Sequence, residues 1–203
     1  AETCYLYIRD EYYGLIKLIE NEIKKLESLN IIKKDFLIIR RGAGAYICGE
    51  ESALIESIEG KRGLPRNRPP YVAEVGLFGK PTLVHNVETV YWIREIFEKG
   101  GKWFSSHGRN GRKGLRTFSV SGNVKSPGIK LTDAGITINE LIEEHCGGML
   151  DGHKFKGYLP GGASGGILPA SLGNIPLDFD TLQEYGCFTV SYTHLRAHET
   201  FAN

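Results

Sequence analysis

Three glycines and two adjacent glutamates form the stretch of this chain that is best suited to chemistry: Gly42, Gly44, Gly49, Glu50 and Glu51. Because glycine has no Cβ, the backbone here can bend sharply and approach a ligand closely. The glutamates can accept hydrogen bonds from ribose hydroxyls or ring N–H groups, although they would repel a phosphate placed directly on them. The residues alone leave a second interpretation open, in which the glycines only make a turn and the glutamates only cap a helix.

The elements around this stretch are predicted to be a strand and a helix. The short apolar run Phe36–Ile39 before it is typical of a buried strand. After it, Leu54 and Ile58 recur at helical spacing, and Gly60 stands where a helix C-terminus favours glycine. The expected order is therefore strand, tight turn, helix. A helix that begins at such a turn presents unpaired N–H groups, which favour anions.

A second strand and helix are expected upstream of the turn. Cys4–Ile8 reads as a strand, and Asp10 is suited to cap the helix that follows. One face of that helix is apolar: Tyr12, Leu15, Ile16, Ile19, Ile23 and Leu26. With Phe36–Ile39 this predicts a βαβ unit with parallel strands and a right-handed crossover. Ligands bind beyond the carboxyl ends of such strands, which is where Gly42–Glu51 falls.

The sequence Gly42–Leu54 resembles the signature of the FMN- and NAD(H)-binding flavoprotein subunits. That family serves respiratory complex I, NAD-reducing hydrogenases and NAD-dependent formate dehydrogenases. The resemblance reaches to about Phe188, and four further stretches carry it: Glu59–Arg62, Pro69–Tyr71, Gly76–Thr82 and Asn86–Thr89. Residues 108–115 and 157–169 are most similar to the beta subunit of NAD-dependent formate dehydrogenases, so we expect that branch of the family.

The resemblance implies an oxidoreductase subunit of the NADH dehydrogenase or diaphorase type. Such a subunit exchanges a hydride between NAD(H) and FMN and passes single electrons to iron–sulfur clusters. It implies FMN and NAD as cofactors, a 4Fe-4S cluster in the full-length protein, and a small iron–sulfur subunit and a catalytic subunit as partners. No residue is expected to act as nucleophile or general base, because the flavin carries the chemistry. The alternative is a non-catalytic β-grasp scaffold.

The resemblance also assigns cofactor contacts. It places FMN at two groups of residues: Gly42, Gly44, Tyr46, Gly49 and Glu50, then Val84, His85, Asn86 and Thr89. NAD(H) would face Tyr46, Glu51 and Tyr71, with the Tyr71 ring stacked on the adenine. Many family members have two asparagines where this chain has His85 and Asn86, so His85 departs from the pattern. Helix capping alone explains Asn86, and a lone histidine is most often structural.

The second half of the chain is expected to form a small β-grasp domain. Residues 109–116 are rich in glycine and basic residues without an apolar period, which is typical of a linker. Thr117–Ser121 alternates like a strand, and Thr137–Glu140 has the spacing of a capping box. Phe155–Leu159 reads as a further strand. Pro160–Gly166 lacks the Gly-Lys-Ser/Thr ending of a phosphate loop, so a flexible connection or a subunit contact is expected.

The predicted fold class is α/β, in three segments. Residues 1–108 would be the C-terminal part of a Rossmann-like FMN/NAD-binding domain, and 109–189 the β-grasp domain. Residues 190–203 match no continuation of the family and resemble a translated sequencing adapter, so we exclude them from function; a genuine polar tail is the alternative. We expect a fragment, because the family's upstream glycine-rich loop and C-terminal four-cysteine cluster domain have no counterpart in this chain.

The composition of the chain bears on its binding partners and on the cellular compartment where it is expected. The formal net charge is +1, which gives no reason to expect a polyanion such as nucleic acid. Four basic residues fall between Lys61 and Arg68, and a solvated loop explains them better than a nucleic-acid patch. No apolar run is long enough for direct membrane insertion. The four cysteines lie far apart without a CxxC pair, so reduced thiols in a cytoplasmic protein are expected.

Overall fold

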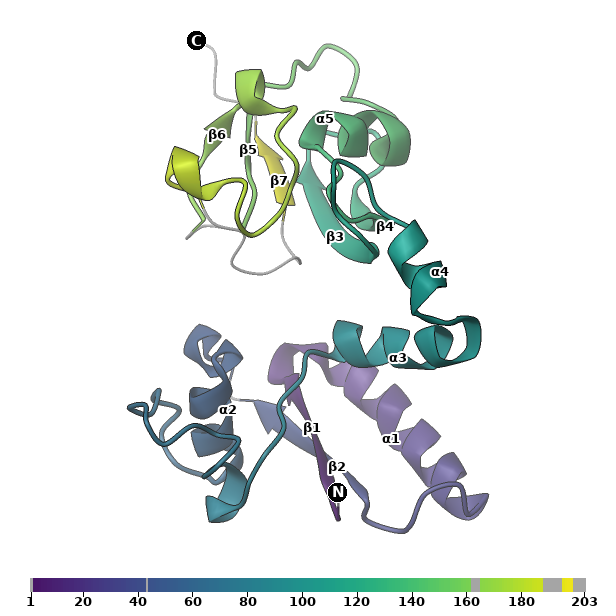
Figure 1. Cartoon of the computed structure of the whole chain (residues 1–203), viewed down its shortest axis with the longest axis vertical. Helices are drawn as coiled ribbons and strands as arrows, with labels where there is room; N and C mark the ends of the chain where they lie inside the picture. The colour runs from purple at the N-terminus through teal and green to yellow at the C-terminus, as the bar shows by residue number, and fades with distance from the viewer. Residues whose placement is uncertain (1, 43, 162–164, 188–194, 199–203) are drawn as a thin grey trace. The chain divides into compact units, whose positions relative to one another are not determined.

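The computed structural model describes residues 2–42, 44–161, 165–187 and 195–198, and it places helices and two small sheets in an α/β arrangement (Figure 1). The chain separates by its internal contacts into two units, Ala1–Val87 and Glu88–Asn203. Each unit is described by itself below. Within the described residues, no helix is both long and apolar enough to cross a lipid bilayer.

The first unit contains a parallel strand pair joined through a helix. Its elements are β1 (Cys4–Arg9), a 3-10 turn (Asp10–Tyr12), α1 (Tyr13–Ser28), β2 (Leu37–Gly42), a second 3-10 turn (Tyr46–Gly49), α2 (Glu51–Ile58) and a third 3-10 turn (Leu77–Gly79). The two strands pair in parallel from Cys4 opposite Leu37 to Arg9 opposite Gly42. The predicted strand–helix–strand order and the parallel pairing are therefore confirmed.

The predicted role of Asp10 as a helix cap is wrong. Asp10 lies in the 3-10 turn, and α1 begins three residues later at Tyr13 without a side-chain cap. The Asp10 carboxylate instead accepts a hydrogen bond from Arg41 Nε at 2.6 Å. Asp10 thus forms an ion pair with the end of β2, while Tyr12 occupies the N-cap position of α1. On the predicted apolar face of α1 only Ile16 is fully buried.

The order strand, turn, helix around the glycines is confirmed. β2 starts at Leu37 and continues to Gly42, and α2 starts at Glu51. Gly60 follows the C-cap of α2 with a φ of +78°, a conformation that glycine adopts without a steric penalty. At Gly42 the reason for glycine is packing, because an added Cβ would lie 2.6 Å from the Tyr7 ring.

The second unit consists of helices and a five-stranded sheet. Its helices and turns are α3 (Val87–Lys99, which starts at the unit boundary), α4 (Gly101–Ser106), α5 (Ile138–Glu140), a π turn (Leu141–His145) and two 3-10 turns (Ala170–Leu172 and Gln183–Tyr185). Its strands are β3 (Leu115–Gly122), β4 (Gly128–Asp133), β5 (Gly157–Leu159), β6 (Leu168–Pro169) and β7 (Leu195–His198). The order across the sheet is β4-β3-β7-β5-β6. The predicted strand at Thr117–Ser121 is confirmed as part of β3, which pairs antiparallel with β4.

The central strand β7 comes from the segment that the sequence excludes from function. It pairs in parallel with β3 and antiparallel with β5. The rest of 190–203, apart from Leu195–His198, lies outside the described residues, as do Gly162, Ala163 and Ser164 of the predicted glycine-rich connection. The adapter origin of this segment stays a prediction.

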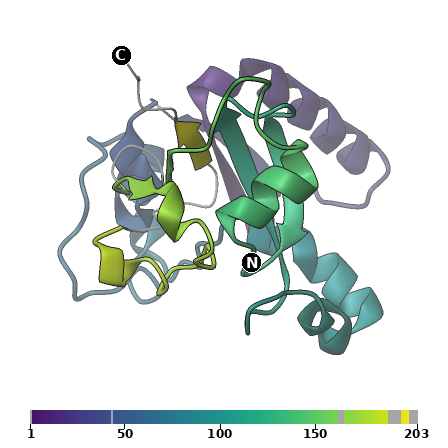
Figure 2. The same ribbon diagram turned by 90° about the horizontal axis from the view of Figure 1, so that it is seen from above.

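The core of the second unit lies between the sheet and residues 138–145, which are α5 and the π turn that follows it. These residues, called the α5 segment here, cross the sheet in Figure 2. Phe118 and Val120 of β3 are buried against a cluster that includes Ile138, Leu141 and Ile142. Alternating inward residues on β3 and helical spacing on the α5 segment put these side chains on facing surfaces.

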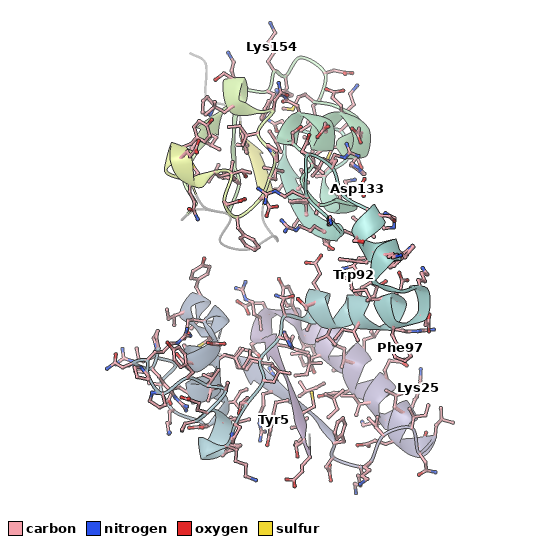
Figure 3. All side chains as sticks on the ribbon, in the orientation of Figure 1. Tyr5, Lys25, Trp92, Phe97, Asp133 and Lys154 are labelled. Carbon is pink, nitrogen blue, oxygen red and sulfur yellow. The ribbon has the colours of Figure 1, made fainter. Side chains whose placement is uncertain are left out.

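Residues 107–114, which belong to the second unit, are hydrogen-bonded to other parts of it. Arg109 N donates to Ala134 O at 2.9 Å, and Ala134 N donates to Gly114 O at 2.9 Å. Asp133, labelled in Figure 3 at the end of β4, accepts a hydrogen bond from Gly108 N at 3.0 Å. The side chains of Arg109 and Arg112 form ion pairs with acidic residues far away in sequence: Glu144 and Asp180, at 2.9 Å and 2.6 Å. Backbone and side-chain bonds thus both hold a segment whose composition predicts a linker.

The start of α5 gives a stability prediction. Thr137 is the N-cap: its Oγ1 accepts from Glu140 N, and the Glu140 carboxylate accepts from Thr137 N, which completes the predicted capping box. Thr137→Ala removes the acceptor and should lower the free energy of unfolding by about 1 kcal/mol. Thr137→Ser keeps the hydroxyl and is the matched control. Urea unfolding of both variants measures this, and equal losses would contradict a capping role.

Candidate functional site

The glycine turn exposes backbone and an aromatic ring at the carboxyl end of β2. Gly44 has a φ of +71°, and Gly49 has no heavy atom within 4 Å of the position that a Cβ would occupy. The Tyr46 side chain is 75% exposed although it belongs to an ordered 3-10 turn. An open backbone beside an exposed ring leaves room for a flat ligand to approach closely.

The carboxylate of Glu50 is the N-cap of α2. Its Oε2 accepts from Ser52 N at 3.0 Å and Ala53 N at 2.9 Å, and it also accepts from Ser52 Oγ. Its Oε1 accepts from Arg68 Nη2 at 2.7 Å. Partial burial acts to raise the pKa of Glu50, but the hydrogen bonds from Ser52 and Ala53 and the Arg68 charge outweigh it, and the pKa is lowered. Glu50 is therefore ionised at neutral pH.

Glu51 is the first residue of α2 and is held differently. Its Oε1 lies 2.7 Å from the same Arg68 Nη2 that contacts Glu50, and 37% of its side chain is exposed. One guanidinium thus joins two adjacent carboxylates. The sequence places Glu51 near a ligand but gives no indication that a cation already sits beside it.

Residues 61–82 form a loop that is fastened to α2 by its basic residues. Arg66 Nη2 lies 3.2 Å from Glu59 Oε1, its Nε pairs with Glu56, and its backbone N donates to Ser52 Oγ at 2.8 Å. Lys61 Nζ lies 2.7 Å from Glu59 Oε2. With Arg68, three of the five basic residues of this loop pair with carboxylates of α2 or its ends, so the charges of these three are largely compensated.

An open groove of about 740 Å³ lies beside this loop. Its lining is Glu56, Glu59, Lys61, Arg66, Asn67, Pro70, Val75, Gly76, Phe78 and Gly79. None of the predicted cofactor residues is among them, and its charged side chains pair with one another. The groove is therefore separate from the candidate site.

Tyr71 is presented by the same loop. It follows Arg68, Pro69 and Pro70, its side chain is 56% exposed, and its carbonyl accepts from the backbone N–H groups of Glu74 and Val75 at 2.9 Å each. Because Arg68 is bonded to Glu50 and Glu51, the loop that carries Tyr71 is tied to the start of α2. The structure thus connects Tyr71 to the glycine turn through Arg68.

The remaining predicted residues lie along the segment that leads to α3. This segment is tied to the loop by Thr82, whose N donates to Val72 O at 3.0 Å. Val84 is half-buried, whereas His85 and Asn86 are exposed, and Asn86 immediately precedes α3. Thr89 belongs to the second unit, so its place beside the glycine turn stays a prediction.

Three residues that hold the site together were not identified as site residues from the sequence: Ser52, Arg66 and Arg68. Their signals were present but weak. Ser52 follows the N-cap by two residues, where a hydroxyl can bond the capping side chain. Arg66 and Arg68 stand among prolines and glycine, a composition that predicts a loop but not which carboxylates it meets. Among the described residues, no group of histidine, cysteine or acidic side chains is arranged to hold a metal ion.

Comparisons with known proteins agree with the resemblance in the sequence. Residues 1–95 match the family model described as the Nuo51 FMN-binding domain, and residues 117–168 match the SLBB domain. An NADH-quinone oxidoreductase subunit of Rhizobium meliloti (strain 1021) is 41% identical over 194 residues, which cover 92% of this chain and 46% of the relative. NADH dehydrogenase [ubiquinone] flavoprotein 1, mitochondrial, of Dictyostelium discoideum is 43% identical over 195 residues, 91% of this chain and 41% of the relative.

A solved structure shows the same fold. A chain of the NAD+-reducing [NiFe]-hydrogenase in the air-oxidized state superposes with a TM-score of 0.82 at 34% sequence identity. The match covers 98% of this chain and 33% of that one. The chain thus spans less than half the length of the curated relatives it matches.

The ionised state of Glu50 gives a pH prediction. Because its folded-state pKa is lowered, it contributes stability above its ordinary pKa of about 4.5, and that contribution is lost as the pH falls through the lower folded-state value. Glu50→Gln should unfold more easily than the parent at neutral pH, and the difference should shrink on acidification below pH 4.5. Melting temperatures between neutral pH and pH of about 3 measure this; parallel curves for the two proteins would contradict it.

Proposed function

Because this chain joins a domain of the Nuo51 FMN-binding family to an SLBB domain, we propose that it belongs to a flavoprotein subunit that transfers a hydride between NAD(H) and FMN. When bound, FMN supplies the chemistry, accepting a hydride and releasing single electrons to iron–sulfur clusters. A further 4Fe-4S cluster would belong to the full-length protein. In this proposal the residues of the chain bind and orient the cofactors.

The observation that carries the proposal is a pair of exposed tyrosines, one in the glycine turn and one on the loop that Arg68 bonds to the start of α2. Tyr46 and Tyr71 are 75% and 56% exposed, and the loop of Tyr71 is bonded to the carboxylates that follow Tyr46. Exposed rings in ordered turns are suited to stack on the flat rings of a nucleotide. The open backbone at Gly49 lets a cofactor approach without a side chain between them.

Glu51 is proposed to accept hydrogen bonds from the ribose hydroxyls of NAD(H). Its side chain is 37% exposed, so Arg68 leaves part of it accessible. Glu50 is already bonded on both oxygens, and its proposed contribution is to fix the turn on which FMN lies. Gly42, Gly44, Val84, His85, Asn86 and Thr89 stay proposed FMN contacts.

The finer fold assignment is also part of the proposal. Residues 1–108 would be part of a Rossmann-like domain, and the parallel β1–β2 pair joined through α1 supports this. Residues 109–189 would be a β-grasp domain, which the β3–β4 hairpin followed by α5 and β5 supports.

We propose that the chain works within a cytoplasmic multi-subunit oxidoreductase, beside a small iron–sulfur subunit and a catalytic subunit. Formate as electron source remains our prediction from residues 108–115 and 157–169. The relatives named above are an NADH-quinone oxidoreductase subunit and a chain of an NAD+-reducing hydrogenase. Quinone and hydrogen are therefore the other candidate electron partners.

The 203-residue chain alone should bind FMN poorly and oxidise no NADH. The reason is that the resemblance assigns the wrapping of the FMN phosphate to an upstream loop without a counterpart in this sequence. Titration of FMN fluorescence with the purified chain measures the affinity. A submicromolar dissociation constant would show that Gly42–Thr89 suffices by itself.

Glu51→Gln in the full-length flavoprotein should relax the preference for NADH over NADPH. The 2′-phosphate of NADPH would meet the Glu51 carboxylate, and the resulting repulsion of ~1–2 kcal/mol corresponds to a preference of about five- to thirty-fold. Glutamine keeps the shape and removes the charge, so FMN content should stay near that of the parent. The ratio of kcat/KM for the two nucleotides measures this. If Glu51 serves only as a helix-dipole acid, the ratio is unchanged and only a small stability loss appears.

A further inference from the structure

A single arginine holds the two acidic residues at the start of α2. The Nη2 atom of Arg68 lies 2.7 Å from Glu50 Oε1 and 2.7 Å from Glu51 Oε1. Arg68 reaches them from a loop eighteen residues further along the chain than Glu50. The contact is therefore tertiary, and α2 alone cannot form it.

The two glutamates depend on Arg68 to different degrees. Glu50 has three other donors, the Ser52 and Ala53 backbone N–H groups and the Ser52 hydroxyl, and it stays in place as the helix cap without Arg68. Within the described part of the chain, the Glu51 side chain forms one ion pair, which is the one with Arg68. Loss of Arg68 would thus leave Glu50 fixed and release Glu51.

Release would also move Glu51, because the two carboxylates repel each other. Adjacent like charges without a shared cation favour conformations that separate them. The Glu51 side chain is 37% exposed and has room to turn toward solvent. The guanidinium of Arg68, whose side chain is 42% exposed, offsets this repulsion while leaving part of Glu51 accessible.

We propose that Arg68 is a positioning residue that holds the Glu51 carboxylate beside Glu50, in the place where it meets a nucleotide ribose. The nucleotide part of this inference rests on the proposed function, whereas the positioning of Glu51 is a property of the chain alone. The same contact links the Tyr71 loop to the acceptor carboxylate, so ring and carboxylate keep a fixed separation.

The first test uses the 203-residue chain without cofactor. Arg68→Gln should lower the melting temperature by about 2–4 °C at low ionic strength, and by less in high salt. Adding Glu51→Gln to Arg68→Gln should restore at least half of the loss, because it removes the repulsion. In the parent background Glu51→Gln should not stabilise. Arg62→Gln is the matched control, an exposed arginine of the same loop with no ion pair recorded in the described part of the chain, and it should change little.

Arg68→Lys keeps the charge without the planar fork and should lie between the parent and Arg68→Gln. If Arg68→Gln is too unstable to measure, Arg68→Lys with and without Glu51→Gln decides the same question. A double variant that melts no higher than Arg68→Gln overturns the proposal.

The second test uses the full-length flavoprotein. Arg68→Gln should raise the KM for NADH by about 3- to 10-fold, with kcat and FMN content near those of the parent. In the Glu51→Gln background the same change should alter KM by less than about twofold. Equal effects in both backgrounds overturn the role of Arg68 through Glu51. A parent protein that oxidises no NADH refutes the proposed function instead, and the melting experiment then decides the positioning of Glu51 alone.

Discussion

The structure of the first unit depends on hydrogen-bond acceptors for the first backbone N–H groups of α2. Glu50 meets this requirement with one carboxylate oxygen and uses the other to hold Arg68. Ser52 is almost fully buried, and its hydroxyl donates to Glu50 and accepts from Arg66 N. The cap and the loop are therefore connected a second time, by hydrogen bonds through Ser52. The start of α2 and the loop of Tyr71 are thus joined at one capping site.

The local elements were predictable because their signals are local. The apolar runs of β1 and β2, the positive φ at Gly60 and the capping box at Thr137 each follow from a few neighbouring residues. The failures all involve partners far apart in sequence. Asp10 was expected to cap α1, yet Arg41 binds it from a position 31 residues away. Composition gives the charge of a residue but not which opposite charge the fold brings to it.

The same limit applies to the candidate site and to the second unit. The sequence predicts Glu50 and Glu51 as cofactor contacts, but it assigns Arg68, which joins their carboxylates, to a solvated loop. Residues 109–116 read as a linker, because glycines and basic residues without an apolar period carry no packing signal. In the fold, Arg116 Nη1 lies 2.7 Å from the nearly buried carboxylate of Asp178. A buried carboxylate requires such a partner, and a sequence pattern cannot specify it.

The contact between Gly42 and Tyr7 changes how one of the family's glycines should be interpreted. The Tyr7 ring occupies the space that a Cβ at Gly42 would need, and its hydroxyl lies 3.0 Å from Ser57 Oγ on α2. A Cβ at position 42 would displace this ring, so internal packing favours glycine there whether or not a cofactor binds. Invariance of this glycine across relatives would then be evidence of internal packing, whereas Gly49, which faces open space, is the position where invariance would report a ligand.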